Sequence, residues 1–97
     1  MTTKIEIIYK CEYNFFYSLM EKIENKDVII KKKIEDFDDV YWIGLYNFSS
    51  IVFNYNVYLG INIFLENEDD ELSIENRQNL LVLSEKLKKI VLEIKSQ

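Results

Sequence analysis

Residues 51–65 read IVFNYNVYLGINIFL and carry the strongest β-strand pattern in the chain. Every odd position in this stretch is apolar, whereas the even positions include three asparagines and a glycine. Because successive side chains of a strand point to opposite faces of a sheet, the alternation predicts one buried face and one polar face. A two-residue hairpin turn inside the stretch would reverse the alternation. The pattern therefore favours one long strand, bent or bulged near Gly60, and leaves two shorter strands as the alternative.

Shorter elements flank this stretch on both sides. Runs rich in β-branched residues predict strands at residues 4–10, 27–34 and 40–46. Apolar residues at helical spacing predict one helix over residues 12–25 and a second over Ile74–Lys95, with Ser73 as its N-cap. The order β-α-β-β-β-α predicts an α+β fold, in which an antiparallel sheet of about four strands carries two helices on one face.

The length and the apolar content fit a single domain over residues 1–97. The chain has 97 residues, of which 48% are hydrophobic, so it can bury a core without disulfides or metals. Its one cysteine, Cys11, excludes an intrachain disulfide. Trp42, Phe53 and Leu87 are expected in the core. A basic and apolar leader is not visible, and the uncharged residues 40–65 contain too many polar side chains for a membrane span, which predicts a cytoplasmic protein that does not contact a membrane.

The residues that most enzymes and metal sites require are missing. The chain has no histidine and one cysteine, which excludes Ser–His and Cys–His pairs and the usual zinc sites. Gly44 and Gly60 stand alone and do not form a phosphate-binding loop. The acidic residues 66–71 lack the glycine and the glutamate spacing of a calcium loop. We therefore expect no cofactor, no metal and no catalytic activity; an enzyme that uses carboxylates alone is the remaining catalytic alternative.

Charge is distributed unevenly along the chain. The net charge is −5, and residues 36–76 contain nine acidic residues and neither lysine nor arginine. This pattern favours a basic protein as partner and disfavours direct binding to nucleic acid.

The acidic turns give a candidate binding site. If strands 40–46 and 51–65 pair as antiparallel neighbours, residues 35–39 and 66–71 lie toward the same end of the sheet and form one negative edge. Tyr46 and Tyr58 occupy even positions and are expected to be exposed contact residues, Tyr58 nearer the acidic edge. The predicted partner-binding residues are Asp36, Asp38, Asp39, Tyr46, Tyr58, Glu66, Glu68, Asp69, Asp70 and Glu71.

The second half of the chain has a recognisable order of features. Trp42-x-Gly44 precedes a polar turn, an alternating strand, an acidic loop, Leu72-Ser73 and a helix rich in leucine and isoleucine. This order resembles small bacterial domains that are found beside polymorphic or contact-dependent toxin genes and are taken to be immunity proteins. The resemblance covers residues 42–97 and assigns no functional residue. It implies an inhibitor that occludes a basic toxin domain, for example a nuclease.

Two alternatives to an immunity protein follow from the same sequence. A phage-encoded inhibitor of a host defence nuclease needs the same small, acidic, protein-binding surface. A structural module that forms a homodimer, through an exposed edge or through the final helix, belongs to a different class and needs no other partner.

Overall fold

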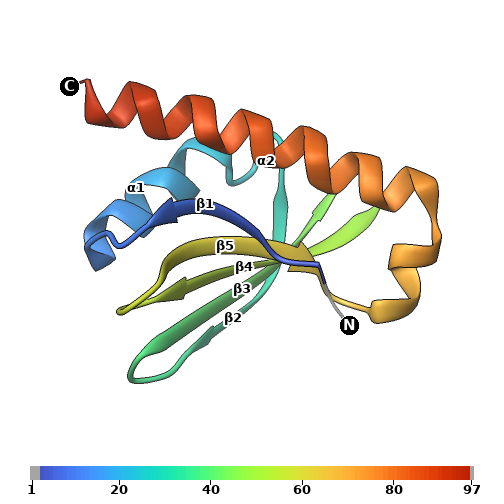
Figure 1. Cartoon of the computed structure of the whole chain (residues 1–97), viewed down its shortest axis with the longest axis horizontal. Helices are drawn as coiled ribbons and strands as arrows, with labels where there is room; N and C mark the ends of the chain where they lie inside the picture. The colour runs from blue at the N-terminus through green and yellow to red at the C-terminus, as the bar shows by residue number, and fades with distance from the viewer. Residues whose placement is uncertain (1–2, 97) are drawn as a thin grey trace.

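In the computed structural model, which describes residues 3–96, five antiparallel strands form one sheet (Figure 1). The strands are β1 (Ile5–Tyr9), β2 (Ile29–Glu35), β3 (Asp39–Tyr46), β4 (Ser49–Asn56) and β5 (Gly60–Leu65). The sheet order is β1-β5-β4-β3-β2, so the first strand pairs with the last. With helix α1 (Tyr13–Ile23) after β1 and helix α2 (Ile74–Lys95) at the end, the α+β prediction is confirmed, but with five strands in place of about four.

The additional strand comes from residues 51–65, which form a hairpin. Strands β4 and β5 are joined by residues 57–59, and the register pairs Tyr55 with Ile61 and Phe53 with Ile63. A three-residue connection pairs odd positions with odd positions, so the same face of both strands stays apolar and the alternation continues without a break. The preference for one long strand is therefore wrong: a two-residue turn would reverse the alternation, but the three-residue connection that the chain uses does not.

Gly60 is the residue that allows this hairpin to fit against β1. Its φ of +93° lies in the region that favours glycine, and a Cβ atom there would lie 2.2 Å from the carbonyl oxygen of Ile8. The Asn56 side chain organises the connection, because its Oδ1 accepts the backbone N–H groups of Tyr58 at 2.8 Å and Leu59 at 3.0 Å.

The core lies between one face of the sheet and the two helices, which cover the same side (Figure 1). Trp42, Phe53 and Leu87 are buried in it, as expected. Ser73 caps α2, since its side chain accepts the backbone N–H of Asn76 at 3.3 Å. A short 3₁₀ helix, η1 (Glu68–Leu72), occupies the segment expected to be an acidic loop.

The other face of the sheet carries no helix from the described residues (Figure 1). Its centre holds an amide pair, in which Asn62 Nδ2 donates to Asn54 Oδ1 at 3.0 Å and Asn54 Nδ2 donates to the carbonyl of Val40 at 3.1 Å. The asparagines of the alternating stretch therefore bond to neighbouring strands, and Asn54 is buried although it lies on the uncovered face.

Both edges of the sheet are irregular. The pairing of β1 with β5 shifts register between Glu6 and Ile8, and that of β2 with β3 shifts between Ile30 and Lys32. Strand β2, the edge on the far side from β1, also carries three consecutive lysines over residues 31–33.

Candidate functional site

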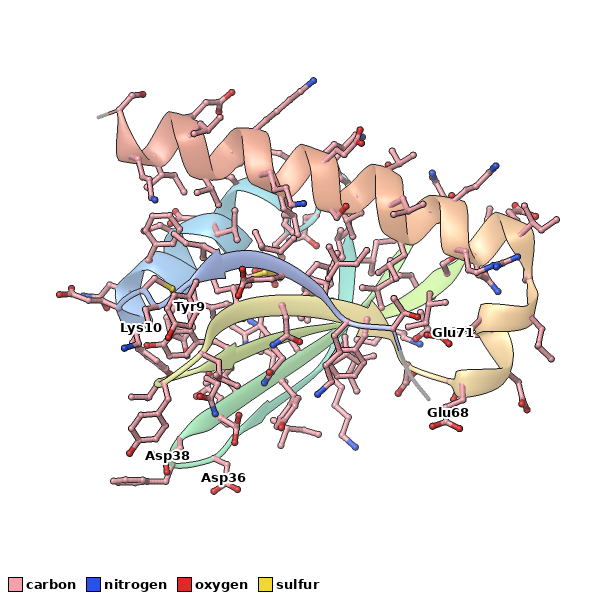
Figure 2. The ribbon with its side chains drawn as sticks, in the orientation of Figure 1. Tyr9, Lys10, Asp36, Asp38, Glu68 and Glu71 are labelled. Atoms are coloured by element: carbon pink, nitrogen blue, oxygen red, sulfur yellow. The ribbon has the colours of Figure 1, made fainter. Side chains whose placement is uncertain are left out.

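The two acidic segments lie at opposite ends of the sheet. Residues 36–38 connect β2 to β3, whereas η1 follows β5. Because the β4–β5 hairpin reverses the chain, Leu65 pairs with Ile51 and lies far along the sheet from Val40. Figure 2 shows Asp36 and Asp38 at one end of the molecule and Glu68 and Glu71 at the other. The prediction of one negative edge is therefore wrong, and its cause is the hairpin.

Some of the acids at the η1 end bond within the protein. Glu66 Oε1 accepts the hydroxyl of Ser50 at 2.7 Å. Glu71 Oε1 accepts the backbone N–H of Thr3 at 2.5 Å and joins η1 to the start of β1. Asp70 and Glu71 are partly buried, whereas Glu66, Glu68 and Asp69 are exposed. At the η1 end of the sheet, carboxylates that form hydrogen bonds within the protein thus lie next to carboxylates that are exposed to solvent.

Tyr46 does not lie on the exposed face. It is only 4% exposed, and Lys86 Nζ lies 5.3 Å from the centre of its ring. The reason is the two-residue turn of Asn47 and Phe48, whose φ values of 48° and 69° are those of a hairpin turn of the primed type. This turn pairs Tyr46 with Ser49, so the core side changes from even positions in β3 to odd positions in β4. Tyr46 is therefore a core residue and cannot contact a partner as predicted.

Tyr58 is exposed as predicted, and it lies next to the acidic residues 36–38. The backbone N–H of Val57 donates to the carbonyl of Asp38 at 3.1 Å, which joins the β4–β5 connection to the β2–β3 turn. We call residues 36–39 and 57–59 together the hairpin tips. Of the ten predicted site residues, Asp36, Asp38, Asp39 and Tyr58 belong to this surface.

The hairpin tips expose large apolar side chains. Phe37 is 94% exposed and Tyr58 is 65% exposed, and Val57 and Leu59 are also exposed. Hairpin connections usually consist of glycine, asparagine, aspartate and other small polar residues. Three consecutive large apolar residues at 57–59 therefore stand exposed next to a turn that carries an exposed phenylalanine and the acidic residues Asp36 and Asp38.

The sequence prediction did not include Phe37, Val57 or Leu59. Val57 and Leu59 occupy odd positions and were assigned to the buried face of a continuous strand. Phe37 lies in the middle of an acidic turn, where an isolated aromatic residue is not expected to be part of the core. Its position in the sequence could therefore have indicated an exposed contact residue.

The hairpin tips are held by polar contacts. The backbone N–H of Asp36 donates to the carbonyl of Asp39 at 2.8 Å, and the N–H of Phe37 donates to Asp36 Oδ1 at 2.8 Å. Tyr9 lies close by, because it pairs with Gly60, and the N–H of Lys10 donates to the carbonyl of Leu59 at 3.3 Å. Figure 2 shows Tyr9 and Lys10 at the same end as Asp36 and Asp38. The exposed side chains therefore project from a fixed backbone.

Residues 3–96 do not form a metal site, an activated thiol or a membrane-spanning helix. No group of three or more cysteine, aspartate or glutamate side chains in this part of the chain could hold a metal ion. Burial raises the pKa of the Cys11 thiol to about 11, against an opposing effect of Lys95. Such a thiol stays protonated at neutral pH. No helix within residues 3–96 is long and apolar enough to cross a membrane.

Comparison with known proteins finds no matching family model, no matching characterised protein and no matching solved structure.

Proposed function

We propose that this protein is an inhibitor that binds a basic protein through the hairpin tips and occludes it. The observation that carries the proposal is the joining of two turns by the Val57–Asp38 hydrogen bond. This bond brings the connection that carries the exposed Tyr58 next to the turn that carries the exposed Phe37 and the acidic residues Asp36 and Asp38. A partner with an apolar depression bordered by lysine or arginine would complement such a surface.

The two kinds of side chain have separate roles in this binding. Carboxylates attract a positively charged partner and raise the association rate, an effect that salt weakens. Aromatic side chains bury a large area and lose little conformational entropy, so they supply most of the affinity at an interface centre. Because the hairpin tips are held by backbone hydrogen bonds, binding orders few additional groups.

A bacterial toxin with a nuclease-like domain is the partner that we favour. Its nucleic-acid cleft would be basic, and a small acidic protein that fills the cleft would prevent access of the substrate. The resemblance of residues 42–97 to immunity-type domains supports this choice. The inhibitor would act in the cytoplasm of the cell that produces it, by binding and without catalysis.

The test is affinity capture of the protein encoded by the neighbouring gene, at low and at high salt. Two variants with matched charge changes locate the site. Asp36→Lys with Asp38→Lys alters the hairpin tips, and Asp69→Lys with Asp70→Lys alters η1; each pair changes the net charge from −5 by +4 to −1. We expect the first pair to slow association and to weaken its salt dependence, while the second pair has a much smaller effect.

Three results would contradict the proposal. If no basic protein is captured, the proposed function fails. If the two pairs slow association equally, net charge and not the hairpin tips attracts the partner. If only the η1 pair reduces binding, the site lies at the opposite end of the sheet.

A further inference from the structure

The outer side of α2 carries a stripe that the core does not use. Leu81, Glu85, Lys88 and Leu92 are spaced by four, three and four residues, which places them on one helix face. The buried residues of the helix, Leu80, Leu83, Leu87 and Val91, form a different face. Leu81 is 56% exposed and Leu92 is 68% exposed. Figure 1 shows α2 as the outermost layer, with the sheet and α1 on its inner side.

The charges of this stripe have no partner within the described residues. Lys86, the neighbouring lysine, forms an ion pair with Asp27 at 3.5 Å. Neither Glu85 nor Lys88 forms an ion pair or a side-chain hydrogen bond with another residue of 3–96. Two oppositely charged side chains thus stand between two exposed leucines.

The stripe is complementary to itself when it is reversed. From the N-terminal side it reads Leu, Glu, Lys, Leu, and in an antiparallel copy it reads Leu, Lys, Glu, Leu. With a two-fold axis between residues 86 and 87, Leu81 faces Leu92 of the second copy and Glu85 faces Lys88 of the second copy. Helices that pack at the usual distance of roughly 8–10 Å bring such side chains into contact. A parallel copy would place Glu85 against Glu85 and Lys88 against Lys88, which is unfavourable.

From this complementarity we infer that a second copy of the chain covers the outer side of α2 in an antiparallel, two-fold symmetric homodimer. The same surface patch serves both copies, as closed dimeric symmetry requires. In this dimer two Leu81–Leu92 contacts flank two Glu85–Lys88 ion pairs that lie next to the symmetry axis. The ion pairs favour the antiparallel orientation, as interhelical charge pairs do in coiled coils.

The dimer should be weak and reversible. One helix pair buries less than the roughly 1,600 Å² of a standard interface, so association will depend on protein concentration. The hairpin tips do not contribute to this contact, because they project from the ends of the strands and not from the helix layer (Figure 1). The inference therefore stands apart from the proposed inhibitory function and can fail without it.

Sedimentation velocity over a concentration series at low salt is the test. Glu85→Lys would place lysine against Lys88 of the other copy, and Lys88→Glu would place glutamate against Glu85; we expect each to weaken dimerisation at least tenfold. The double variant Glu85→Lys with Lys88→Glu exchanges the charges and should restore the dimer. Glu93→Lys, an exposed change of equal charge on another side of α2, should leave dimerisation close to that of the natural chain.

Circular dichroism of each variant checks that the helix is intact, which we expect because Glu85, Lys88 and Glu93 are all exposed. A monomer at every concentration would overturn the inference. So would a dimer that Glu85→Lys does not weaken, or one that the double variant fails to restore, because both results would exclude antiparallel pairing along this stripe.

Discussion

Asn56 Nδ2 donates to the carboxylate of Asp39 at 2.8 Å and thereby joins the β4–β5 hairpin to the start of β3. The Oδ1 atom of the same Asn56 side chain accepts two backbone N–H groups of the β4–β5 connection. One amide thus shapes the connection at residues 57–59 and fixes it to the neighbouring turn. The orientation of the proposed binding surface depends on this residue.

Replacement of Asn56 by alanine should lower the free energy of unfolding by about 1–3 kcal/mol, because polar groups lose their partners. The urea midpoint measures the loss. Asn67→Ala is the matched control, since the Asn67 side chain does not cap η1, and it should change stability by no more than about 0.5 kcal/mol. Equal losses in the two variants would show that the Asn56 contacts contribute nothing specific.

Phe37→Ala and Tyr58→Ala should each reduce the affinity for a captured partner by about 2 kcal/mol or more, the size expected of an aromatic residue at an interface centre. Neither change should affect folding, because both side chains are exposed. Titration calorimetry gives the affinities. Phe48→Ala is the control: Phe48 is equally exposed but lies in the β3–β4 turn, at the other end of the strands. If Phe48→Ala alone weakens binding, the partner contacts that end instead.

Leu87→Ala should lower the free energy of unfolding by about 2–5 kcal/mol, because it opens a cavity between α2 and the sheet. Leu72→Ala removes the same atoms from an exposed leucine of η1 and should cost less than about 0.5 kcal/mol. Denaturant unfolding of both variants measures the difference. A loss below about 1 kcal/mol for Leu87→Ala would mean that α2 is not packed on the sheet as described.

Gly60→Ala tests the hairpin itself. The new Cβ would lie 2.2 Å from the carbonyl oxygen of Ile8 and 2.6 Å from the backbone nitrogen of Lys10, so β1 must move. The positive φ adds a strain of order 1–3 kcal/mol for a residue other than glycine. We expect a large fall in the urea midpoint and faster amide exchange in β1. A stable variant with unchanged exchange would contradict the pairing of β1 with β5.

Cys11 should react slowly with iodoacetamide at neutral pH, because burial raises the pKa of its thiol to about 11. The rate should rise as the pH approaches that value, whereas the denatured chain should react as an ordinary thiol. Between the two pKa values the folded protein retains a proton that the unfolded chain has lost. The stability contributed by this group is therefore present at neutral pH and is lost as the pH rises toward 11. A Cys11→Ala variant should lack this part of the alkaline destabilisation.

The strand content of the chain could be predicted, but the path of the chain between strands could not. Alternation over residues 51–65 correctly indicated that the odd positions of β4 and β5 are buried, but it did not indicate that Val52 and Asn54, at even positions, are buried as well. The same alternation fits a continuous strand and a hairpin with a three-residue connection, because both keep odd positions on one face. The alternation therefore does not determine the length of the connection. For that reason the predicted position of Glu66–Glu71, at the same end of the sheet as residues 35–39, was wrong.

Tyr46 and Tyr58 show a second limit of sequence reasoning. Both occupy even positions, yet one is buried and the other exposed. The β3–β4 turn has two residues and exchanges the core side from even to odd positions, while the β4–β5 connection has three and does not. To know whether odd or even positions face the core after a turn, one must know how many residues the turn contains. Asn47 suggests a two-residue turn but does not determine its length.

The irregular edges of the sheet affect the tendency of the protein to aggregate at high concentration. A chain that is 48% hydrophobic and has no proline is at risk of growing into fibrils by adding strands to a regular edge. Here the register shift near Lys31 breaks the regular pairing of β2 with β3, which bends and twists this edge strand, and the lysines at residues 31–33 repel an approaching copy of the same edge. The shift between Glu6 and Ile8 interrupts β1 in the same way. We expect these two local distortions to hinder fibril growth at both edges of the sheet that residues 3–96 form.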